Sequence, residues 1–556
     1  MNEMKITIIV HQNDKEKFKG FQENVIKKIR VPYLDGRPFA VNVLHTVGEK
    51  RGPVFNKAMR QSDAKYKVYI GADVVDVEPQ LLLWIIKGFL ANKRMGLLGF
   101  LGSGMPLSGK AADARNNRWG RYFRQGQVGI SFEQPLFWQD VSLVDSQVMA
   151  TSVDVPWDEE CGDDFLGAAA CLARRQQGIE VAVPMLPGMA YISSAPSEYD
   201  RTDMDEDAHR EFPARYRQEL EPLVSVLIPA YNEPDFCREA LESVLAQDYG
   251  NIEILIGDDS TDDRVEKVLQ PYLKEHLNIH YEHHEKPYGS TKNVEALLAS
   301  CHGDYVNVLM HDDIFMPKKI STMMSYFVQD VNEDIGFVTS TRPYIMKDGK
   351  YVDDPVRLIF DKDAVICDES LAKKILQTCI NVVGELSTVL FRKSLIKVEG
   401  DAKFPYRIGY FGGYKEDSMG DVSTWLHLLS QRKCVFIKEQ LSAFRRSDNQ
   451  NTWKPGIMIQ SALDWLNLIV AARRQGKILR TQQDFEIACQ GWHDLMKPHM
   501  LSMKEKFVGD LQGSFDTFMA EIEAVEQHDY DGVVELATAN MGQAEKNLLH
   551  AGNEIS

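Results

Sequence analysis

Two pairs of acidic residues stand directly after short apolar segments in the middle of the chain. Asp258 and Asp259 follow one segment, and Asp312 and Asp313 follow another. Short apolar runs that alternate with helix-like segments predict βαβ units in a parallel sheet. Ligands bind such sheets at the carboxyl ends of the strands. Because carboxylates bind divalent cations and accept hydrogen bonds, we predict that these four acids form a ligand site.

The turn after the first strand of this region restricts what the site can bind. Its sequence, Pro229-Ala-Tyr-Asn-Glu-Pro234, contains no glycine. A dinucleotide-binding turn needs glycine for close backbone approach, and a P-loop needs Gly-Lys-Ser/Thr. A diphosphate here would instead be neutralised by a divalent cation on a strand-end carboxylate. We assign the cation to the second acidic pair and a base or ribose to the first pair.

Single motifs of this kind also have simpler explanations. Either acidic pair could cap the following helix, because Asp and Ser are good N-cap residues. Four histidines lie nearby, but they lack the cysteine partners and the spacing of a zinc site: they are His280, His283, His284 and His311. An ordered set of motifs is therefore needed to distinguish a ligand site from local capping.

Such a set is present between Val224 and Arg446, and it resembles the inverting family 2 glycosyltransferases of GT-A fold. The matching motifs are Ile228-Pro-Ala-Tyr-Asn-Glu233, Gly257-Asp-Asp-Ser260, Lys292-Asn293, His311-Asp-Asp313 with Pro317, Gly384-Glu-Leu-Ser-Thr-Val-Leu-Phe-Arg-Lys-Ser394, Gly420-Asp-Val-Ser-Thr-Trp-Leu426 and Phe444-Arg-Arg446. Their order and spacing follow those of the family.

The resemblance implies a role for each matching residue. Asp259 matches the carboxylate that contacts a uracil-type base, with Asp258 beside it, and Lys292 matches a basic residue near the nucleotide. Asp312 matches the last acid of the DXD motif, which binds Mn²⁺ or Mg²⁺ and the diphosphate. Asp421 matches the general base that accepts the proton of the acceptor hydroxyl. The implied nucleotide-binding set is completed by Pro229, Tyr231, Glu233 and Asp313.

The chain departs from the family pattern at two positions. Met310 stands where the first acid of the DXD motif is expected, which leaves the metal fewer protein ligands. Gly420 stands where a Glu precedes the general base. Glu416 and Asp417, in a nearby glycine-rich loop, are therefore alternative candidates for the base.

The first part of the chain repeats this pattern. Residues 6–13 mirror 225–232, and the seven-residue spacing from Tyr66 to Asp73 equals that from Tyr305 to Asp312. Internal similarity of this kind predicts a second domain of the same fold.

This first domain is similar to a bacterial glycosyltransferase-like family. The similarity runs through Asp145, the run Trp157-Asp-Glu-Glu160 and Asp164. The candidate site residues of the domain are Asp73, Asp158 and Asp164. Its second predicted strand, residues 40–46, lacks an Asp-Asp pair to read a base, so the sequence leaves the activity of this domain open.

Composition narrows the function further. The net charge of −18 argues against nucleic acid or an anionic membrane as the main partner. Eight unpaired-looking cysteines and the lack of a secretory signal predict a reducing, cytoplasmic location. The most apolar segment, Leu81 to Leu101, is interrupted by Lys87, Lys93 and Arg94, so no transmembrane segment is expected.

We expect an α/β fold with four parts: a GT-A-like domain at 1–194, a linker at 195–222, a family 2 domain at 223–454 and a helical region at 455–556. Ile457, Trp465 and Ile469 recur at helical spacing in the last part, and Gly476 fits a C-cap. These helices could pack without chemistry, mediate self-association, cover the acceptor site or dock a partner.

The leading hypothesis is a bacterial, metal-dependent glycosyltransferase of polysaccharide biosynthesis. It would move a sugar from a nucleotide-diphosphate sugar, a UDP-sugar, to a hydroxyl of a glycan, glycolipid or protein. If both domains are active, they could add successive sugars. A nucleotidyltransferase would need a glycine-rich basic loop after the first strand, which is missing. The alternative is a non-catalytic glycan-binding or scaffold protein built from degenerate GT-A modules.

Overall fold

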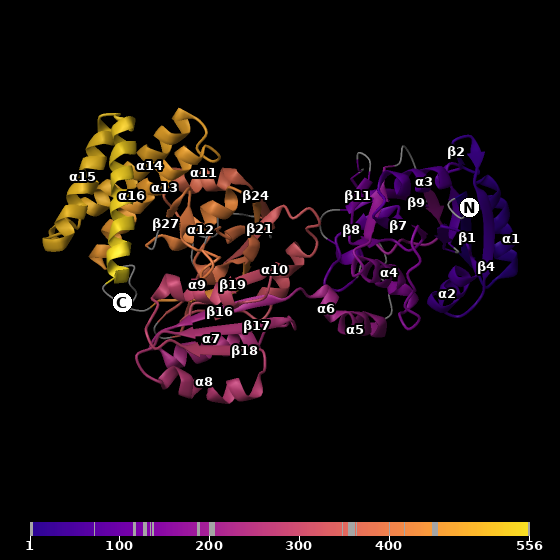
Figure 1. Cartoon of the computed structure of the whole chain (residues 1–556), viewed down its shortest axis with the longest axis horizontal. Helices are drawn as coiled ribbons and strands as arrows, with labels where there is room; N and C mark the ends of the chain where they lie inside the picture. Colours follow the sequence, from indigo (N-terminus) through magenta and orange to yellow (C-terminus); the bar gives the residue numbers. More distant parts are fainter. Residues whose placement is uncertain are drawn as a thin grey trace. The chain divides into compact units, whose positions relative to one another are not determined.

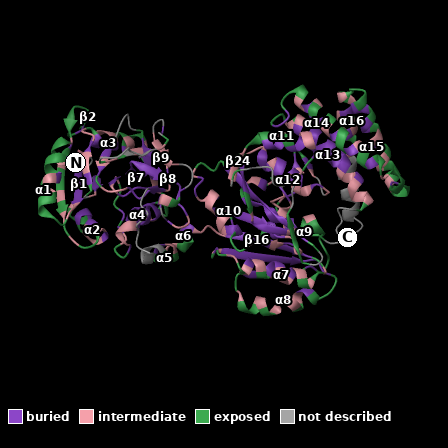
Figure 2. Cartoon of the chain, turned by 180° about the vertical axis from the view of Figure 1, so that it is seen from behind, coloured by how far each residue is buried: buried purple, intermediate pink, exposed green. Residues whose placement is uncertain are grey.

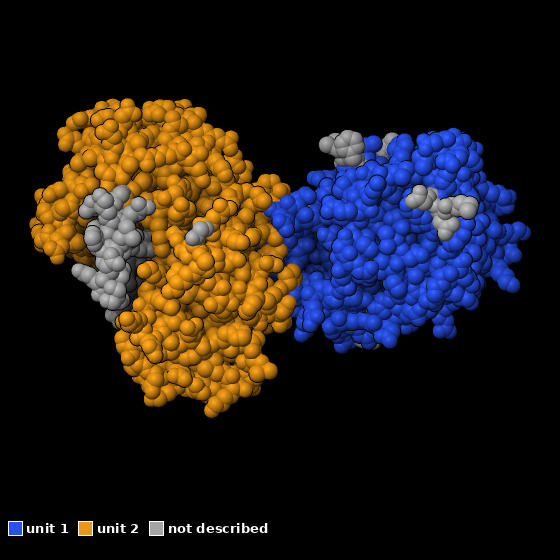
Figure 3. Space-filling model, viewed as in Figure 1, with its two compact units in different colours: residues 1–221, 324–333 blue, residues 222–323, 334–556 orange. Residues whose placement is uncertain are grey.

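The computed structural model describes residues 4–71, 73–109, 111–114, 118–125, 130–133, 135, 138–185, 190–199, 206–346, 349–353, 362, 364–399, 401–415, 418–446 and 454–553. The chain divides into two compact units (Figures 1 and 3). Unit 1 contains residues 1–221 and 324–333, and unit 2 contains residues 222–323 and 334–556.

Unit 1 is built around a seven-stranded sheet with the strand order β11-β14-β7-β13-β5-β1-β4. These strands are β1 (Lys5–His11), β4 (Ala40–Thr46), β5 (Tyr66–Ile70), β7 (Met95–Gly99), β11 (Trp138–Asp140), β13 (Val148–Thr151) and β14 (Glu180–Pro184). A smaller sheet has the order β12-β8-β9-β15-β6, with β10 paired to β9. It comprises β6 (Val74–Val77), β8 (Leu101–Ser103), β9 (Arg118–Arg124), β10 (Ile130–Ser131), β12 (Leu143–Val144) and β15 (Tyr191–Ser193), and a separate hairpin joins β2 (Tyr33–Leu34) to β3 (Arg37–Pro38).

The helices of unit 1 connect its strands, and several of them pack against its central sheet. They are α1 (Lys15–Asn24), α2 (Arg51–Gln61), α3 (Leu81–Ala91), α4 (Leu166–Arg175), α5 (Glu206–Arg215) and α6 (Arg217–Leu220). The apolar segment that starts at Leu81 forms α3 and β7, and Leu81, Leu82 and Ile85 are fully buried in the core. α5 and α6 lie within the predicted linker, and Phe212 of α5 stacks on Phe165 at 4.5 Å between ring centroids. This part of the linker is therefore packed against unit 1.

Unit 2 has an eight-stranded sheet with the order β18-β17-β16-β19-β25-β21-β28-β24. Its strands are β16 (Val224–Ala230), β17 (Ile252–Asp258), β18 (Ile279–His283), β19 (Tyr305–Val308), β21 (Ile335–Thr341), β24 (Ala364–Cys367), β25 (Leu390–Arg392) and β28 (Lys433–Gln440). All seven residues of both β16 and β17 are buried, as expected for parallel strands covered on two faces (Figure 2). The smaller sheet β20-β29-β22-β23 and a hairpin complete the strands: β20 (Ile314–Phe315), β22 (Pro343–Ile345), β23 (Tyr351–Asp353), β29 (Ser442–Arg445), β26 (Tyr410–Phe411) and β27 (Tyr414–Lys415).

Helices connect these strands and form the last part of the chain. The connecting helices are α7 (Pro234–Leu245), α8 (Arg264–Glu275), α9 (Ser290–Ser300), α10 (Lys319–Phe327), α11 (Glu369–Thr378) and α12 (Gly420–Leu429). The C-terminal helices are α13 (Pro455–Gln475), α14 (Gln482–Leu501), α15 (Gln512–Glu526) and α16 (Tyr530–Asn553). By length and composition α13 could cross a membrane, and it is the one such helix in the described part of the chain. However, 67% of its apolar window is buried inside the structure, which is typical of a core helix.

The central sheets of the two units share one topology. Strands β4-β1-β5-β13-β7-β14-β11 of unit 1 correspond in order to β17-β16-β19-β25-β21-β28-β24 of unit 2. Each corresponding pair also has the same direction: parallel between the first three strands, antiparallel on both sides of β13 or β25, parallel in the next pair and antiparallel at the edge. The edge strand β18 extends the sheet of unit 2 alone. The internal repeat seen in the sequence is therefore a repeat of the fold.

Candidate active site

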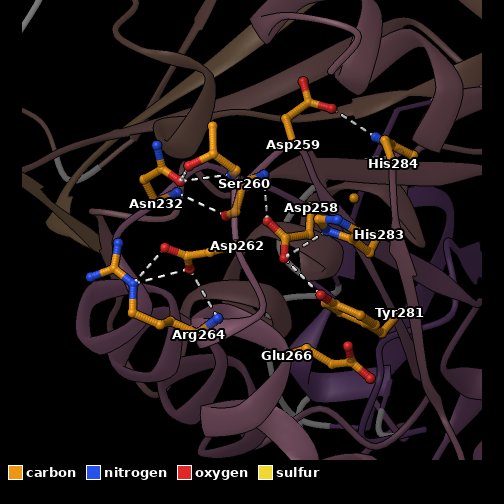
Figure 4. A network of polar contacts seen from close by, with 12 residues as sticks. Asn232, Asp258, Asp259, Ser260, Asp262, Arg264, Glu266, Tyr281, His283 and His284 are labelled. Atoms are coloured by element: carbon orange, nitrogen blue, oxygen red, sulfur yellow. Dashed lines mark hydrogen bonds and ion pairs between the residues drawn. The ribbon is translucent and has the colours of Figure 1, made fainter. Parts of the chain in front are cut away.

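Asp258 ends β17 and is held entirely by protein groups. Its side chain is fully buried. The Tyr281 hydroxyl donates to Oδ2 at 2.6 Å, the Ser260 amide donates to Oδ1 at 2.9 Å, and His283 Nδ1 lies 3.5 Å from Oδ2 (Figure 4). Burial and the neighbouring carboxylate raise the pKa of Tyr281, so its hydroxyl stays protonated and remains a donor. Asp258 therefore fixes the end of β17 to β18.

Asp259 connects β17 to the start of α9. It is 4% exposed and accepts a hydrogen bond from His284 Nδ1 at 2.8 Å (Figure 4). It also accepts from the backbone amides of Tyr288 and Gly289 at 3.0 and 2.8 Å. α9 begins at the next residue, so Asp259 positions its first turn, where Lys292 is exposed. The predicted contact between Asp259 and a base stays a prediction.

The turn after β16 is locked to the same strand end. Asn232 adopts a left-handed conformation (φ 55°), which Asn tolerates better than most residues. The backbone amide of Asn232 donates to Ser260 Oγ at 2.8 Å, and Asn232 Oδ1 accepts from the backbone amide of Thr261 at 2.9 Å (Figure 4). Of the predicted nucleotide contacts in this turn, Tyr231 is 50% exposed and Glu233 is exposed at the start of α7. The third, Pro229, is buried and offers its carbonyl to His311 Nδ1 at 3.1 Å.

The second acidic pair, after β19, divides into a buried acid and a more exposed one. Asp313 is 1% exposed and accepts from Ser387 Oγ at 2.5 Å and from the Arg445 amide at 3.0 Å. Burial, followed by the charge of Asp312, raises the pKa of Asp313 well above its usual value. Asp312 is partly exposed, and its carbonyl accepts from Arg445 Nε at 2.8 Å. Metal binding by Asp312 stays a prediction, and Asp313 is held in the turn by protein donors.

Met310 occupies the position of the absent acid and belongs to the core. It packs against the buried apolar cluster of unit 2, and its amide donates to Ser387 Oγ at 3.0 Å. In the described residues, no group of three or more His, Cys, Asp or Glu side chains is arranged to hold a metal ion. A cation at Asp312 would therefore need oxygen ligands from a bound diphosphate.

Asp421 lies in the first turn of α12 and has a fixed orientation. Asn381 Nδ2 donates to Oδ2 at 2.8 Å, and the Val422 amide donates to Oδ1 at 2.8 Å. Asn381 in turn exchanges two hydrogen bonds with Gly384, at 3.0 and 3.1 Å. Trp425 Nε1 also donates to the Gly384 carbonyl at 2.8 Å. The other two candidate bases, Glu416 and Asp417, lie outside the described residues.

Residues 381–388, here called the bridging segment, connect the two sets of acids. Asn381 at its beginning holds Asp421, and Ser387 near its end holds Asp313. Between them, Glu385 forms an ion pair with the buried Arg342, whose Nε donates at 2.8 Å. The sequence motif contained Ser387 and Glu385, but no local signal indicated that Asn381 would contact Asp421, 40 residues away.

Unit 1 has a cavity of about 390 Å³ at the carboxyl ends of β1 and β5. Two of its predicted site residues, Asp73 and Asp164, line this cavity. Asp158 is not among the lining residues, and it accepts hydrogen bonds from the Tyr216 hydroxyl and from Arg215. The lining residues are His11, Arg51, Gly71, Asp73, Ser146, Gln147, Asp163, Asp164, Ala195, Pro196 and Glu198.

Charged groups in this cavity are partly paired. The Arg51 amide donates to Asp163 Oδ1 at 2.9 Å, and its side chain forms an ion pair with the same residue at 3.4 Å. Glu198 is 7% exposed and accepts from Ser146 Oγ. Burial, followed by the charge of Asp145, raises the pKa of Glu198 to about 8. Glu198 is not among the residues predicted from the sequence, because it lies within the predicted linker.

The strand order and the acids at the strand ends define both units as GT-A-type α/β domains, and the C-terminal region is helical, as predicted. Residues 225–368 match the model for Glycosyl transferase family 2, and residues 7–216 match the model for a Glycosyltransferase like family. Over these residues unit 2 is similar to the family 2 glycosyltransferases and unit 1 to a glycosyltransferase-like family. The family 2 match ends before Asp421. The proposal that Asp421 is the general base therefore depends on its hydrogen bonds in the structure.

Relatives and solved structures are similar over parts of the chain. An uncharacterized glycosyltransferase of Rickettsia typhi is 34% identical over 114 residues, which are 20% of this chain and 35% of that protein. The chain thus spans about a third of that relative's length. Glycosyltransferase GlyG of Streptococcus pneumoniae is 24% identical over 271 residues, which are 48% of this chain and 77% of GlyG. The crystal structure of S. aureus TarS 1-349 is 16% identical in sequence, with a TM-score of 0.38, and the match covers 57% of this chain and 91% of TarS 1-349. This similarity is too weak to support an argument about function.

Proposed function

We propose that unit 2 transfers a sugar from a nucleotide-diphosphate sugar, a UDP-sugar, to a hydroxyl of a glycan, glycolipid or protein with inversion. The observation that supports this most is the bridging segment, which holds Asp421 at one end and the Asp312–Asp313 turn at the other. An inverting transfer is an in-line displacement, which needs a base beside the acceptor and charge stabilisation beside the leaving diphosphate. The bridging segment links residues suited to these two tasks.

Asp421 is the proposed base. Its carboxylate accepts the proton of the acceptor hydroxyl while the acceptor oxygen forms a bond to the anomeric carbon. The bond between that carbon and the diphosphate oxygen breaks, and the proton remains on Asp421. The hydrogen bonds from Asn381 and the Val422 amide hold the carboxylate in one orientation, so little reorganisation accompanies proton transfer.

Asp312 is the proposed ligand of Mn²⁺ or Mg²⁺. A carboxylate oxygen suits these hard cations, and Asp312 is partly exposed where the strand ends. A bound cation would neutralise the charge that develops on the diphosphate. The neighbouring Asp313 accepts hydrogen bonds from Ser387 and the Arg445 amide and thereby holds the turn in place.

The first acidic pair and α9 are the proposed nucleotide side of the site. Asp258 and Asp259 hold the strand end and the first turn of α9 in a fixed position, and Lys292 is exposed on that turn. Tyr231 and Glu233 are exposed on the neighbouring turn. A fixed surface with a lysine and an exposed ring suits a nucleotide with its negative diphosphate.

We place the protein in the cytoplasm, in polysaccharide biosynthesis. All eight cysteines are free thiols, and seven of them are buried, as expected in a reducing compartment. Self-association through α13–α16 stays a prediction.

The proposed function can be tested by measuring nucleotide release from UDP-, GDP- and dTDP-sugars with Mn²⁺ or Mg²⁺. We expect turnover on a UDP-sugar that is lost in Asp312→Ala, because the diphosphate loses its cation. Asp510→Ala, which removes an exposed carboxylate in the C-terminal region, is the matched control. If no donor is turned over and none binds in calorimetry, the result favours the alternative hypothesis of a non-catalytic glycan-binding protein over that of a transferase.

A further inference from the structure

The cavity of unit 1 differs from the proposed donor site of unit 2 in what its strand ends can recognise. In unit 2 the end of β17 carries Asp258 and Asp259 and is flanked by β18. In unit 1 the corresponding strand β4 carries no acidic residue, and it is the edge of the sheet. Near its end, His45 stacks on Phe18 with 3.6 Å between ring centroids. The elements that would hold a nucleoside in unit 2 therefore have no counterpart here.

The charge of the cavity also opposes a diphosphate. Asp73, Asp163 and Asp164 line it, against a single lining arginine, Arg51, which is already paired with Asp163. A diphosphate would meet repulsion from an excess of carboxylates. The raised pKa of Glu198 keeps that carboxyl largely protonated at neutral pH, so it can donate as well as accept a hydrogen bond.

The rest of the lining suits a neutral ligand rich in hydroxyl groups. Arg51, Gln147 and His11 bring donors, the carboxylates bring acceptors, and a sugar hydroxyl uses one of each. Ala195 and Pro196 give the cavity a small apolar wall. Its volume of about 390 Å³ falls within the range of small-ligand sites.

Two residues of this lining each carry a buried polar atom without a partner. His11 Nδ1 and Gln147 Oε1 are buried and have no hydrogen-bond partner within the described residues. Buried polar atoms are rarely left without a partner, because an unsatisfied donor or acceptor destabilises the folded state. A ligand or ordered water in the cavity would supply these partners after small side-chain rotations.

We infer that unit 1 binds a neutral saccharide in this cavity, without a nucleotide, and so acts as a glycan-binding module beside the transferase. This function goes beyond transfer by unit 2 and does not depend on it. Glu198, Arg51 and Gln147 are the residues that we assign to the sugar hydroxyls.

Saturation-transfer NMR on the full chain tests the inference with the methyl glycosides of glucose, galactose, mannose and N-acetylglucosamine. We expect a signal from at least one glycoside. Ala195→Trp fills the cavity and should abolish that signal, and Glu198→Ala, which removes the donor and the acceptor of the carboxyl, should weaken it several-fold. Ala91→Trp, the same change at the exposed end of α3, should leave it intact.

Three results would overturn the inference: no signal from any of the four glycosides, a signal that survives Ala195→Trp, or loss of UDP binding in Ala195→Trp. The last result would mean that the cavity is a donor site. Circular dichroism establishes that each variant is folded. Because nucleotide release by unit 2 is measured separately, failure of the inference and failure of the proposed transfer are distinguishable.

Discussion

The two units place different chemistry on the same strand ends. In unit 2 the acids that follow β17 and β19 are mostly buried and held by donors from the protein, such as Tyr281, His284 and Ser387. In unit 1 the corresponding edge of the sheet surrounds a cavity in which Asp73 is exposed and Glu198 carries a raised pKa. The common sheet therefore determines where a site can form, and the connecting loops determine what it can bind.

The segments before two corresponding strands, β25 in unit 2 and β13 in unit 1, illustrate the difference. In unit 2 this is the bridging segment, whose Asn381 and Ser387 reach acids on both sides. In unit 1 the segment before β13 contains Asp145, which is 1% exposed and accepts from the amides of Gln147 and Glu198 at 2.8 and 3.0 Å. One segment connects the proposed catalytic acids, and the other shapes the wall of a cavity.

The largest expected effect separates the two units by two acids, Asp421 in the first turn of α12 and Asp164 directly before α4. In unit 2, Asp421→Asn removes the proposed base, and we expect transfer to fall about 10²- to 10⁴-fold while donor binding remains. The measurement is nucleotide release with acceptor, together with calorimetry of the donor. Asp516→Asn, the same change on the exposed face of α15, is the control.

The corresponding change in unit 1, Asp164→Asn, sharpens the comparison. We expect no loss of transfer, because unit 1 is not the proposed transferase. A loss shared between Asp164→Asn and Asp421→Asn would indicate two active domains. Transfer that survives Asp421→Asn would instead move the base to Glu416 or Asp417.

A smaller effect is expected from the group that orients the base. Asn381→Ala removes the 2.8 Å hydrogen bond to Asp421 and the contacts with Gly384. A misplaced catalytic group can cost up to about 100-fold in rate, so we expect kcat to fall by about tenfold to 100-fold. The donor KM should stay the same, since Asn381 does not contact the proposed nucleotide side. A rise in KM with unchanged kcat would assign Asn381 to binding.

The repeat of the fold could be predicted from the sequence, because its signal is local. The equal Tyr-to-Asp spacings come from a strand of fixed length followed by a turn, and both units place that turn before the first strand of the smaller sheet. The acids at strand ends were predicted for the same reason. Asp312 and Asp73 follow β19 and β5, where the topology of a parallel sheet collects ligands, whereas Asp421 lies in the first turn of α12.

The partners of these acids could not be predicted, because they come from distant parts of the chain. Tyr281 and His284 reach the acids of β17 only because β18 pairs with it. Glu198 was assigned to a linker since its neighbourhood is polar and lacks periodicity. In the structure Ser197, Glu198 and Tyr199 are all buried in unit 1, through hydrogen bonds that a hydropathy pattern does not reveal.

The packing behind the first acidic pair gives the third prediction, which concerns stability. A Cβ at Gly257 would lie 2.2 Å from Asn293 Oδ1. Asn293 cannot move away without loss, because its Nδ2 donates to the Gly257 carbonyl at 2.8 Å. We expect Gly257→Ala to lower the free energy of unfolding by about 1–3 kcal/mol, the usual cost of overpacking. Thermal and urea unfolding measure this.

The control for this prediction is Gly420→Ala. The nearest atom to a Cβ at Gly420 is Gly409 Cα at 3.7 Å, so the methyl group has room in the first turn of α12. We expect a change in the free energy of unfolding of less than about 1 kcal/mol. Equal losses in the two glycine variants would contradict the close packing of α9 on β17. In unit 1 the corresponding strand β4 is largely exposed, and no such restriction applies.

The last expected effect is a pH dependence that belongs to unit 1. Glu198 has an ordinary pKa of 4.5 and a pKa of about 8 in the folded state. Between these values the folded state binds more protons than the unfolded state, so the free energy of unfolding falls as pH rises, by at most about 1.4 kcal/mol per pH unit. Below pH 4.5 both states are protonated, and the contribution is constant.

Glu198→Gln removes this proton, so the stability of the variant should fall less between pH 5 and pH 8 than that of the wild type. Calorimetric unfolding across this range measures the slope. Glu49→Gln, at an exposed position of unit 1, should keep the wild-type slope. If Glu198→Gln also keeps it, the carboxyl is ionised in the folded state. The cavity would then carry one more negative charge, and a cationic ligand would fit it better than a neutral sugar.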